Sequence, residues 1–199
     1  PVRNALNFPA AILQAPYFDV RNPIAMNLGG TGATIGHEIS HSFDDQGAMF
    51  NADGQLKNWW TPADLAHFQA SGKALARQFD QYHAFPDLPL KGEQELSENI
   101  ADIAGLNAAY DAYRLANGGK EGPSQQGFTG DQQFFIAFAQ SWRAKFREAL
   151  IRQIVVTDGH ALDEFRADTA RNMDAWYPAL GVKPGEKLYL APADRVRIW

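Results

Sequence analysis

The stretch GHEISHSFDD, Gly36–Asp45, places two histidines four residues apart, with a glutamate directly after the first. Apolar residues recur at every fourth position through it, at Ile35, Ile39 and Phe43. This periodicity predicts one face of a helix over about 32–44. Because an α-helix turns by about 100° per residue, His37 and His41 then project from the same side, one turn apart. Two imidazoles at that separation suit two positions of a tetrahedral zinc site.

The other parts of a zinc-peptidase site can be sought from this helix outward. Glu38 lies beside the histidine face, where its carboxylate can reach a water at the metal without being a ligand, so it is the expected general base. A catalytic zinc takes three protein ligands and leaves one position open. Gly47 occupies the place of a third histidine six residues after the second, so a carboxylate is expected instead. The segment SENIAD supplies Glu98 as that ligand, with Asp102 one turn later to accept an imidazole N–H.

Simpler interpretations of the same residues remain open at this point. An isolated H-E-x-x-H pattern also arises by chance, and its histidines would then be surface or capping residues. Asp102 would be a solvated helix carboxylate. The E-x-x-x-D pattern on a second predicted helix is what favours a zinc peptidase over these interpretations. Asp44 and Asp45 could support a ligand or cap the loop, and the sequence does not decide between the two.

Four segments follow one another along the chain: GHEISHSFDDQG, SENIADIAGL, FFIAFAQSW, and TDGH followed by Phe165 and Arg166. In this order they resemble the neprilysin, endothelin-converting-enzyme and bacterial PepO family of zinc metallopeptidases. The segment FPAAILQAPYF and the terminal RIW resemble that family too. The similarity spans essentially the whole chain, and together the motifs are far more specific than the zinc signature alone.

The resemblance implies a set of residues around one Zn²⁺ per chain. The zinc ligands would be His37, His41 and Glu98, with Glu38 as the catalytic base and Asp102 as the carboxylate that supports a ligand.

Two further residues gain a role only through the resemblance. His160 matches the histidine that stabilises the oxyanion, and Asp158, two residues earlier, would orient its ring. Arg166 matches the arginine that holds a backbone carbonyl of the substrate. Without the resemblance, His160 would be a surface residue and Arg166 a salt-bridge partner. Leu162 stands where the family usually has proline, which predicts a slightly different loop before Arg166.

The resemblance also implies a hydrophobic pocket for the residue that follows the scissile bond. The residues expected to form it are Ile12, Tyr17, Ala33, Thr34 and Trp142. Ala33 and Thr34 stand where bulkier apolar residues often occur, which would widen or polarise the pocket. We expect a preference for large apolar residues there.

The expected fold class is mainly α with minor β, the thermolysin-like (gluzincin) zinc-peptidase catalytic domain. Residues 1–199 would form its C-terminal zinc-binding part, with the polar faces of the zinc helix and the Glu98 helix converging. The chain opens without an initiator methionine, and the family's Asn-Ala-Tyr substrate strand would lie upstream of Pro1. We therefore expect an N-terminally truncated fragment that lacks the N-terminal domain of its parent.

Secondary structure can be outlined from prolines, caps and periodicity. Residues 1–26 contain Pro9, Pro16 and Pro23 and should be extended, with one or two short strands. A long helix should begin after Thr61 as N-cap, and another should start near Ser97 and stop at the glycines 118–119. Two more helices are predicted over 131–150 and near 162–177. Apolar residues near the N-terminus look core-facing: Phe8, Ile12, Leu13, Tyr17 and Phe18.

Composition excludes several other classes of protein. The net charge is −5 and Lys and Arg form no long run, so nucleic acid is not an expected partner. No apolar stretch approaches the ~18 residues of a membrane span. The chain has no cysteine, which excludes disulfides and thiolate zinc sites. The family resemblance favours a periplasmic, secreted or membrane-anchored parent.

The predicted function is that of a zinc-dependent endopeptidase acting on short peptides before hydrophobic residues. One alternative is an inactive zinc-binding fragment that lacks the substrate strand and the lid domain. Another is a thermolysin-type protease, against which the SFDD, AQSW and RIW segments argue. An interaction protein with accidental zinc spacing is the remaining alternative. Self-association through an apolar surface left by the absent domain is possible on physical grounds.

Overall fold

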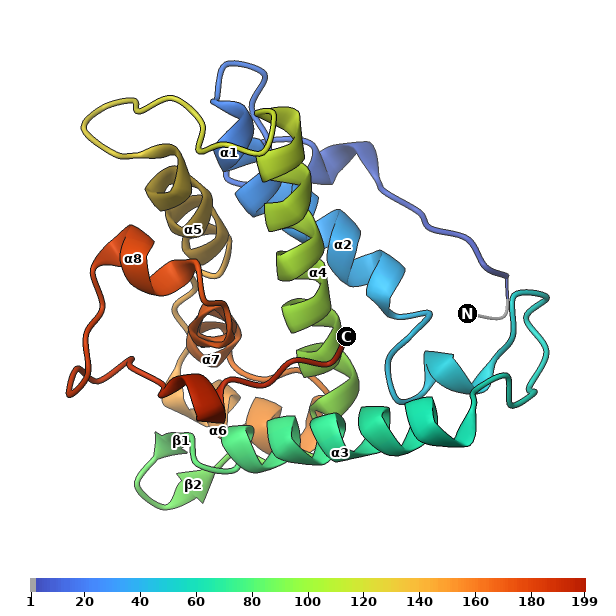
Figure 1. Ribbon diagram of the computed structural model, residues 1–199. Helices are drawn as coiled ribbons and strands as arrows, with labels where there is room; N and C mark the ends of the chain where they lie inside the picture. Colours follow the sequence, from blue (N-terminus) through green and yellow to red (C-terminus); the bar gives the residue numbers. More distant parts are fainter. Residues whose placement is uncertain (1–2) are drawn as a thin grey trace.

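A long central helix, α4 (Leu96–Ala116), organises the fold. Figure 1 shows it running through the middle of the molecule, with the other helices around it. The structure is a computed structural model and describes residues 3–199. Apolar and small residues lie on nearly every face of α4, which is the pattern of a buried helix rather than a surface one.

The N-terminal half of α4 packs into a first hydrophobic core. Ile100 and Ile103 there contact residues of α3 (Pro62–Phe79) and α6 (Glu148–Thr157), together with the C-terminal segment. The helix α3 begins as the sequence predicts, because the Thr61 hydroxyl accepts the Asp64 N–H at 3.2 Å. It ends at Phe79, and the residues that follow form a short antiparallel pair, β1 (His83–Phe85) and β2 (Leu88–Pro89).

The C-terminal half of α4 packs into a second core. Leu106 and Tyr113 meet the phenylalanines of α5 (Gly130–Ser141) and the aromatic residues of α8 (Trp176–Leu180). The two cores share α4, so the position of this one helix couples both halves of the molecule. The short helices α1 (Ile24–Asn27) and α7 (Asp163–Ala167) flank it. A π-helical turn covers Leu28–Gly32, and 3-10 turns cover Ala10–Ile12, Gly47–Met49, Asp168–Asn172 and Pro192–Asp194.

The helix of the HEISH motif, α2 (Ala33–Ser40), crosses α4 with the two backbones in direct contact. A Cβ atom on Gly36 would lie 2.6 Å from the carbonyl oxygen of Gly105. A Cβ on Gly105 would lie 2.3 Å from the backbone nitrogen of His37. Only glycine at both positions allows this approach. The crossing therefore sets the distance between the two predicted ligand-bearing helices.

The buried face of α2 differs from the one that periodicity indicates. The predicted apolar face is solvent-exposed, with exposed fractions of 39% for Ile35, 47% for Ile39 and 42% for Phe43. Small residues, Ala33, Gly36 and Ser40, form the buried face instead. The expectation of core-facing residues near the N-terminus is also wrong, because Leu13 is 50% exposed and the other four are only partly buried.

The structure corrects two predicted features and confirms a third. No strand forms among residues 3–26; the pair β1–β2 is the sheet of the described chain. Ser97 is not an N-cap, because α4 begins at Leu96 with Glu95 in the cap position. The stop at glycines 118–119 is confirmed, since both have positive φ.

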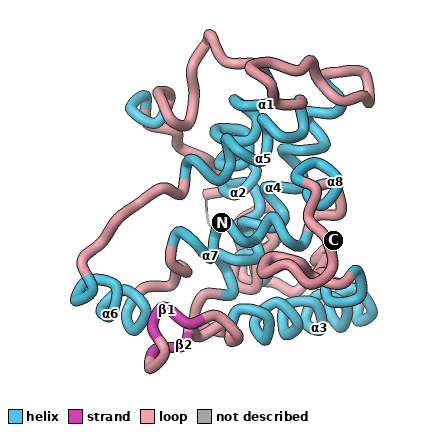
Figure 2. The backbone as a smooth tube through the Cα atoms, turned by 90° about the vertical axis from the view of Figure 1, so that its left-hand side faces the viewer, coloured by secondary structure: helices cyan, strands magenta, loops and turns pink. Residues whose placement is uncertain are grey.

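The helix predicted over 131–150 is two helices. The first, α5, ends at Ser141, whose hydroxyl bonds back to the Phe138 carbonyl, and Trp142 leaves the helix. A long connection then separates it from α6 (Figure 2). The helix predicted near 162–177 is likewise broken, into α7, a 3-10 turn and α8. No helix within residues 3–199 combines the length and the apolar composition that crossing a membrane would require.

Gly105→Ala should destabilise the protein by about 1–3 kcal/mol, because the new methyl group would push against the backbone of His37. The matched control is Gly72→Ala in α3, where a Cβ would lie an ordinary 3.6 Å from the Leu96 side chain. That substitution should stabilise by about 0.5–1 kcal/mol through helix propensity. Urea unfolding measures both changes. Equal stability of the two variants would contradict the close crossing.

Candidate metal centre

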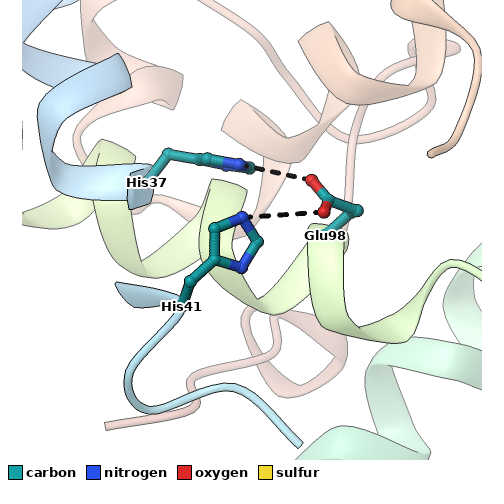
Figure 3. A group of neighbouring side chains, drawn as sticks. All are labelled: His37, His41 and Glu98. Atoms are coloured by element: carbon teal, nitrogen blue, oxygen red, sulfur yellow. Dashed lines mark ion pairs between the residues drawn. The ribbon is translucent and has the colours of Figure 1, made fainter. Parts of the chain in front are cut away.

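Three side chains from two helices meet at the crossing of α2 and α4 (Figure 3). His37 and His41 come from α2 and the turn that ends it, and Glu98 comes from the first turn of α4. The Nε2 atom of His37 lies 3.2 Å from Glu98 Oε2, and the Nε2 atom of His41 lies 3.6 Å from Glu98 Oε1. One donor atom from each residue lies within 4.8 Å of the others. The structure thus brings together the three residues that the sequence singles out as ligands.

A carboxylate holds the far side of each of these imidazoles. Asp102 Oδ1 lies 2.8 Å from His37 Nδ1, and Asp44 Oδ2 lies 2.7 Å from His41 Nδ1. An ionised carboxylate only accepts hydrogen bonds, so each Nδ1 carries the proton. Once the ring is neutral, Nε2 presents a lone pair, which is the tautomer that a metal ligand needs.

Asp44 is the residue that sequence reasoning left undecided. It is 2% exposed, and its Oδ1 accepts the N–H groups of Gln46 at 2.9 Å and Gly47 at 2.6 Å. Burial alone would raise its pKa, but hydrogen bonds from His41 and Ser97 outweigh burial and hold the pKa below its usual value. Asp44 is therefore a buried anion. The available signal was its position three residues after His41, where α2 ends.

The donor set fits a divalent metal ion. Glu98 Oε2 is buried and accepts no hydrogen bond of acceptable geometry, although the Nε2 atoms of His37 and His160 lie 3.2 and 3.1 Å away. Lone pairs facing an anionic oxygen repel one another unless a proton or a metal ion lies between them. Two imidazoles and one carboxylate are ligands that zinc accepts.

The shifted pKa values of His37 and Glu98 also favour positive charge at this place. Burial opposes the charged form of His37, but the carboxylates of Asp102 and Glu98 outweigh burial and raise its pKa to about 9. Burial likewise opposes the charged form of Glu98, and the neighbouring imidazoles of His160 and His37 nevertheless hold its pKa well below the usual range. A cation is thus favoured between these groups.

His160 approaches the centre from the loop before α7. Its Nδ1 lies 2.7 Å from Asp158 Oδ1, and its backbone N–H donates to the same oxygen at 3.0 Å. The bond to Glu98 is the largest influence that raises its pKa, against burial and with help from Asp158. The ring is therefore held by Asp158, as expected, with Nε2 directed at the cluster.

Arg166 is held more tightly than a surface ion pair. Its Nε donates to Asp102 Oδ2 and its Nη2 to Asp102 Oδ1, both at 2.8 Å. Its guanidinium carbon lies 4.2 Å from the centre of the Trp142 ring, a cation–π geometry. Asp102 thus orients two functional groups at once, one nitrogen of His37 and the fork of Arg166.

A cavity of about 190 Å³ opens beside these residues. Glu38 is exposed and lines it without belonging to the donor set. All the residues predicted to contact substrate line it as well: Ile12, Tyr17, Ala33, Thr34, Trp142 and Arg166. Sequence reasoning missed three lining residues, Gly30, Phe138 and Ser141, of which the last two stand inside the FFIAFAQSW motif.

Comparison with known proteins shows which family the chain belongs to. The model of peptidase family M13 matches residues 1–196. The chain is 39% identical over 200 residues to the neutral endopeptidase of Lactobacillus helveticus, with 100% of this chain and 29% of that protein covered. It is 38% identical over 203 residues to human (Homo sapiens) endothelin-converting enzyme 1, with 100% and 26% covered. The chain belongs to peptidase family M13, and the resemblance seen in its motifs is confirmed.

Solved structures support the same assignment. The chain matches the Mycobacterium tuberculosis zinc metalloprotease ZMP1, crystallised with an inhibitor, with a TM-score of 0.93 and 44% identity over 96% of this chain. It matches PEPO from Lactobacillus rhamnosis with a TM-score of 0.86 and 41% identity. The expected fold class, mainly α with little sheet and of the gluzincin type, is confirmed. The chain spans about 30% of these proteins' length, 30% of the first and 29% of the second. The family and these structures imply Zn²⁺ as the metal.

Added Zn²⁺ should stabilise the protein against heat, because the ligands converge only in the folded chain. At free zinc 100 times the dissociation constant the gain is about 2.7 kcal/mol, and a chelator should remove it. Glu98→Ala should abolish the gain. Differential scanning calorimetry of wild type and variant measures both, and an equal gain in the two would show that zinc binds elsewhere.

Proposed function

We propose that these residues form the working site of a zinc-dependent endopeptidase. The observation that carries the proposal is that a metal donor set and an open cavity lie side by side. His37, His41 and Glu98 form a donor set, and the cavity lined by His37 of that set is also lined by Glu38, His160 and Arg166. A structural zinc site would instead be closed by a fourth protein ligand.

The proposed chemistry divides among the residues around that cavity. Bound Zn²⁺ would supply Lewis-acid polarisation of the scissile carbonyl and a more acidic water. Glu38 accepts a proton from the attacking water and passes it to the leaving amine. His160 is held by Asp158, and its raised pKa favours a proton on Nε2 as well, from which the ring donates to the negative oxygen that develops. Oxyanion donors of this kind contribute about 3–4 kcal/mol to transition-state binding.

The remaining side chains position the substrate. Asp102 uses both oxygens to hold Arg166 through Nε and Nη2, which leaves the Nη1 edge to meet a substrate carbonyl. Stacking on Trp142 fixes the plane of the guanidinium beside the cavity. The aromatic and aliphatic lining from Ile12, Tyr17 and Trp142 supports cleavage before a large apolar residue.

The wider setting follows from family membership. Peptides are the proposed substrates. Residues 1–199 are proposed as the C-terminal, zinc-bearing part of a catalytic domain, because the family's proteins are about three times longer than this match. A size limit to short peptides and an extracytoplasmic location of the parent are further proposals. Family M13 replaces the thermolysin-type alternative.

A second candidate function is zinc binding without turnover. The cavity is shallow enough to leave His160 half exposed, with 51% of its side chain accessible. An incompletely covered site holds metal without excluding water from the reaction. Comparing peptide cleavage by the 199-residue chain with cleavage by any longer protein that carries it separates the two candidates.

Glu38→Gln should retain zinc and lose turnover, because glutamine cannot accept the proton but is not a ligand. We expect kcat to fall by about 10²–10⁴-fold with an unchanged zinc content. A quenched fluorescent peptide and metal analysis by mass spectrometry provide the two readouts. Normal turnover by this variant would show that another group is the base.

Peptides that differ only in the residue after the scissile bond test the pocket. Phenylalanine or leucine there should be cleaved faster than aspartate, since Ile12, Phe138 and Trp142 supply apolar walls and Ala33 and Thr34 leave room. The ratio of kcat/KM values should exceed about 10. A preference for small or charged residues would contradict the assigned pocket.

A further inference from the structure

We propose that the Ser97 hydroxyl is a positioning group for the metal centre, tying the helix of Glu98 to the carboxylate that holds His41. Ser97 Oγ donates to Asp44 Oδ2 at 2.6 Å, and His41 Nδ1 lies 2.7 Å from the same oxygen. One oxygen atom thus joins residues from both ligand-bearing elements. The inference rests on the proposed zinc function and deepens it.

No other donor is at hand to replace Ser97 at the Asp44 carboxylate. Its Oδ1 accepts the backbone N–H groups of Gln46 and Gly47, and its Oδ2 serves His41 and Ser97. The side chain is 3% exposed, so water does not readily replace a missing donor. Without Ser97, the oxygen that orients the imidazole keeps only its bond to that imidazole.

The Ser97–Asp44 hydrogen bond joins the two helices at a second place, away from the Gly36–Gly105 contact. The contact of Gly36 with Gly105 fixes the middle of α4. Ser97 precedes Gly105 by about two helical turns, at the start of the helix and directly beside Glu98. The two attachments together define both the separation of α2 from α4 and the direction in which the Glu98 carboxylate points.

The hydroxyl of Ser97 is not needed for helix capping. Glu95 holds the cap position and Ser97 lies within the first turn. The donor goes to a side chain 53 residues away in sequence rather than to a local backbone group. A serine that simply began the helix would bond within its own turn.

Ser97→Ala tests the proposal, with Ser97→Thr as the variant that keeps the hydroxyl. Zinc affinity is measured by competition with a chromophoric chelator on the folded protein. We expect Ser97→Ala to weaken zinc binding about tenfold, the lower end for groups that support metal ligands. Ser97→Thr should stay within about threefold of wild type. The Co²⁺-substituted protein should show an altered visible spectrum for the alanine variant alone.

Ser40→Ala is the matched control for loss of a buried hydroxyl. Ser40 is 7% exposed and donates to the Gly36 carbonyl at 2.7 Å, without contacting a carboxylate of the centre. It should lower the free energy of unfolding while leaving zinc affinity unchanged. If Ser97→Ala lowers only stability in the same way, the hydroxyl is structural and the proposal is overturned.

A double-mutant cycle with Asp44→Asn tests the route of action. If Ser97 acts through Asp44, the double variant should bind zinc no more weakly than Asp44→Asn alone. Additive losses would overturn that route. Absence of zinc binding by the wild type would refute the proposed function and this inference together, whereas equal affinities of wild type and Ser97→Ala refute the inference alone.

Discussion

The backbone contact between Gly36 and Gly105 is the constraint on which the centre depends. It allows α2 and α4 to cross more closely than side chains would permit, with a Cβ on either glycine lying under 3 Å from the other helix. At that separation the short carboxylate of Glu98 reaches the imidazoles of α2. Because α4 is shared by both hydrophobic cores, the packing of the whole chain holds this crossing in place.

The three histidines around the crossing have the same arrangement of neighbouring carboxylates. Each of three histidines presents Nδ1 to an aspartate, and each Nε2 is directed toward Glu98. The aspartates hold a proton on Nδ1, so Nε2 is the atom that His37 and His41 offer to a metal ion. Arg166 supplies the fixed positive charge among these anions through its bonds to Asp102. The site is preorganised for a cation, and its open side is the cavity.

Local patterns predicted the donors and tertiary packing decided the rest. Helical spacing is a property of neighbouring residues, so His37, His41, Glu98 and Asp102 could be placed from sequence. Which face of α2 is buried depends on its partner, and the exposed Ile39 shows that apolar spacing alone misled. The helix α5 ends where Trp142 meets Arg166 of α7, a contact between segments distant in the sequence that local patterns do not show. The role of Asp44 depends on a turn whose shape no periodicity encodes.

X-ray diffraction at the zinc absorption edge would locate the metal ion and its ligands together. We expect a single anomalous peak at the crossing of α2 and α4, at about 2.0–2.2 Å from Nε2 of His37, Nε2 of His41 and a carboxylate oxygen of Glu98. A peak at another place, or a Glu98 side chain turned away from the metal with another group in its stead, would contradict the account.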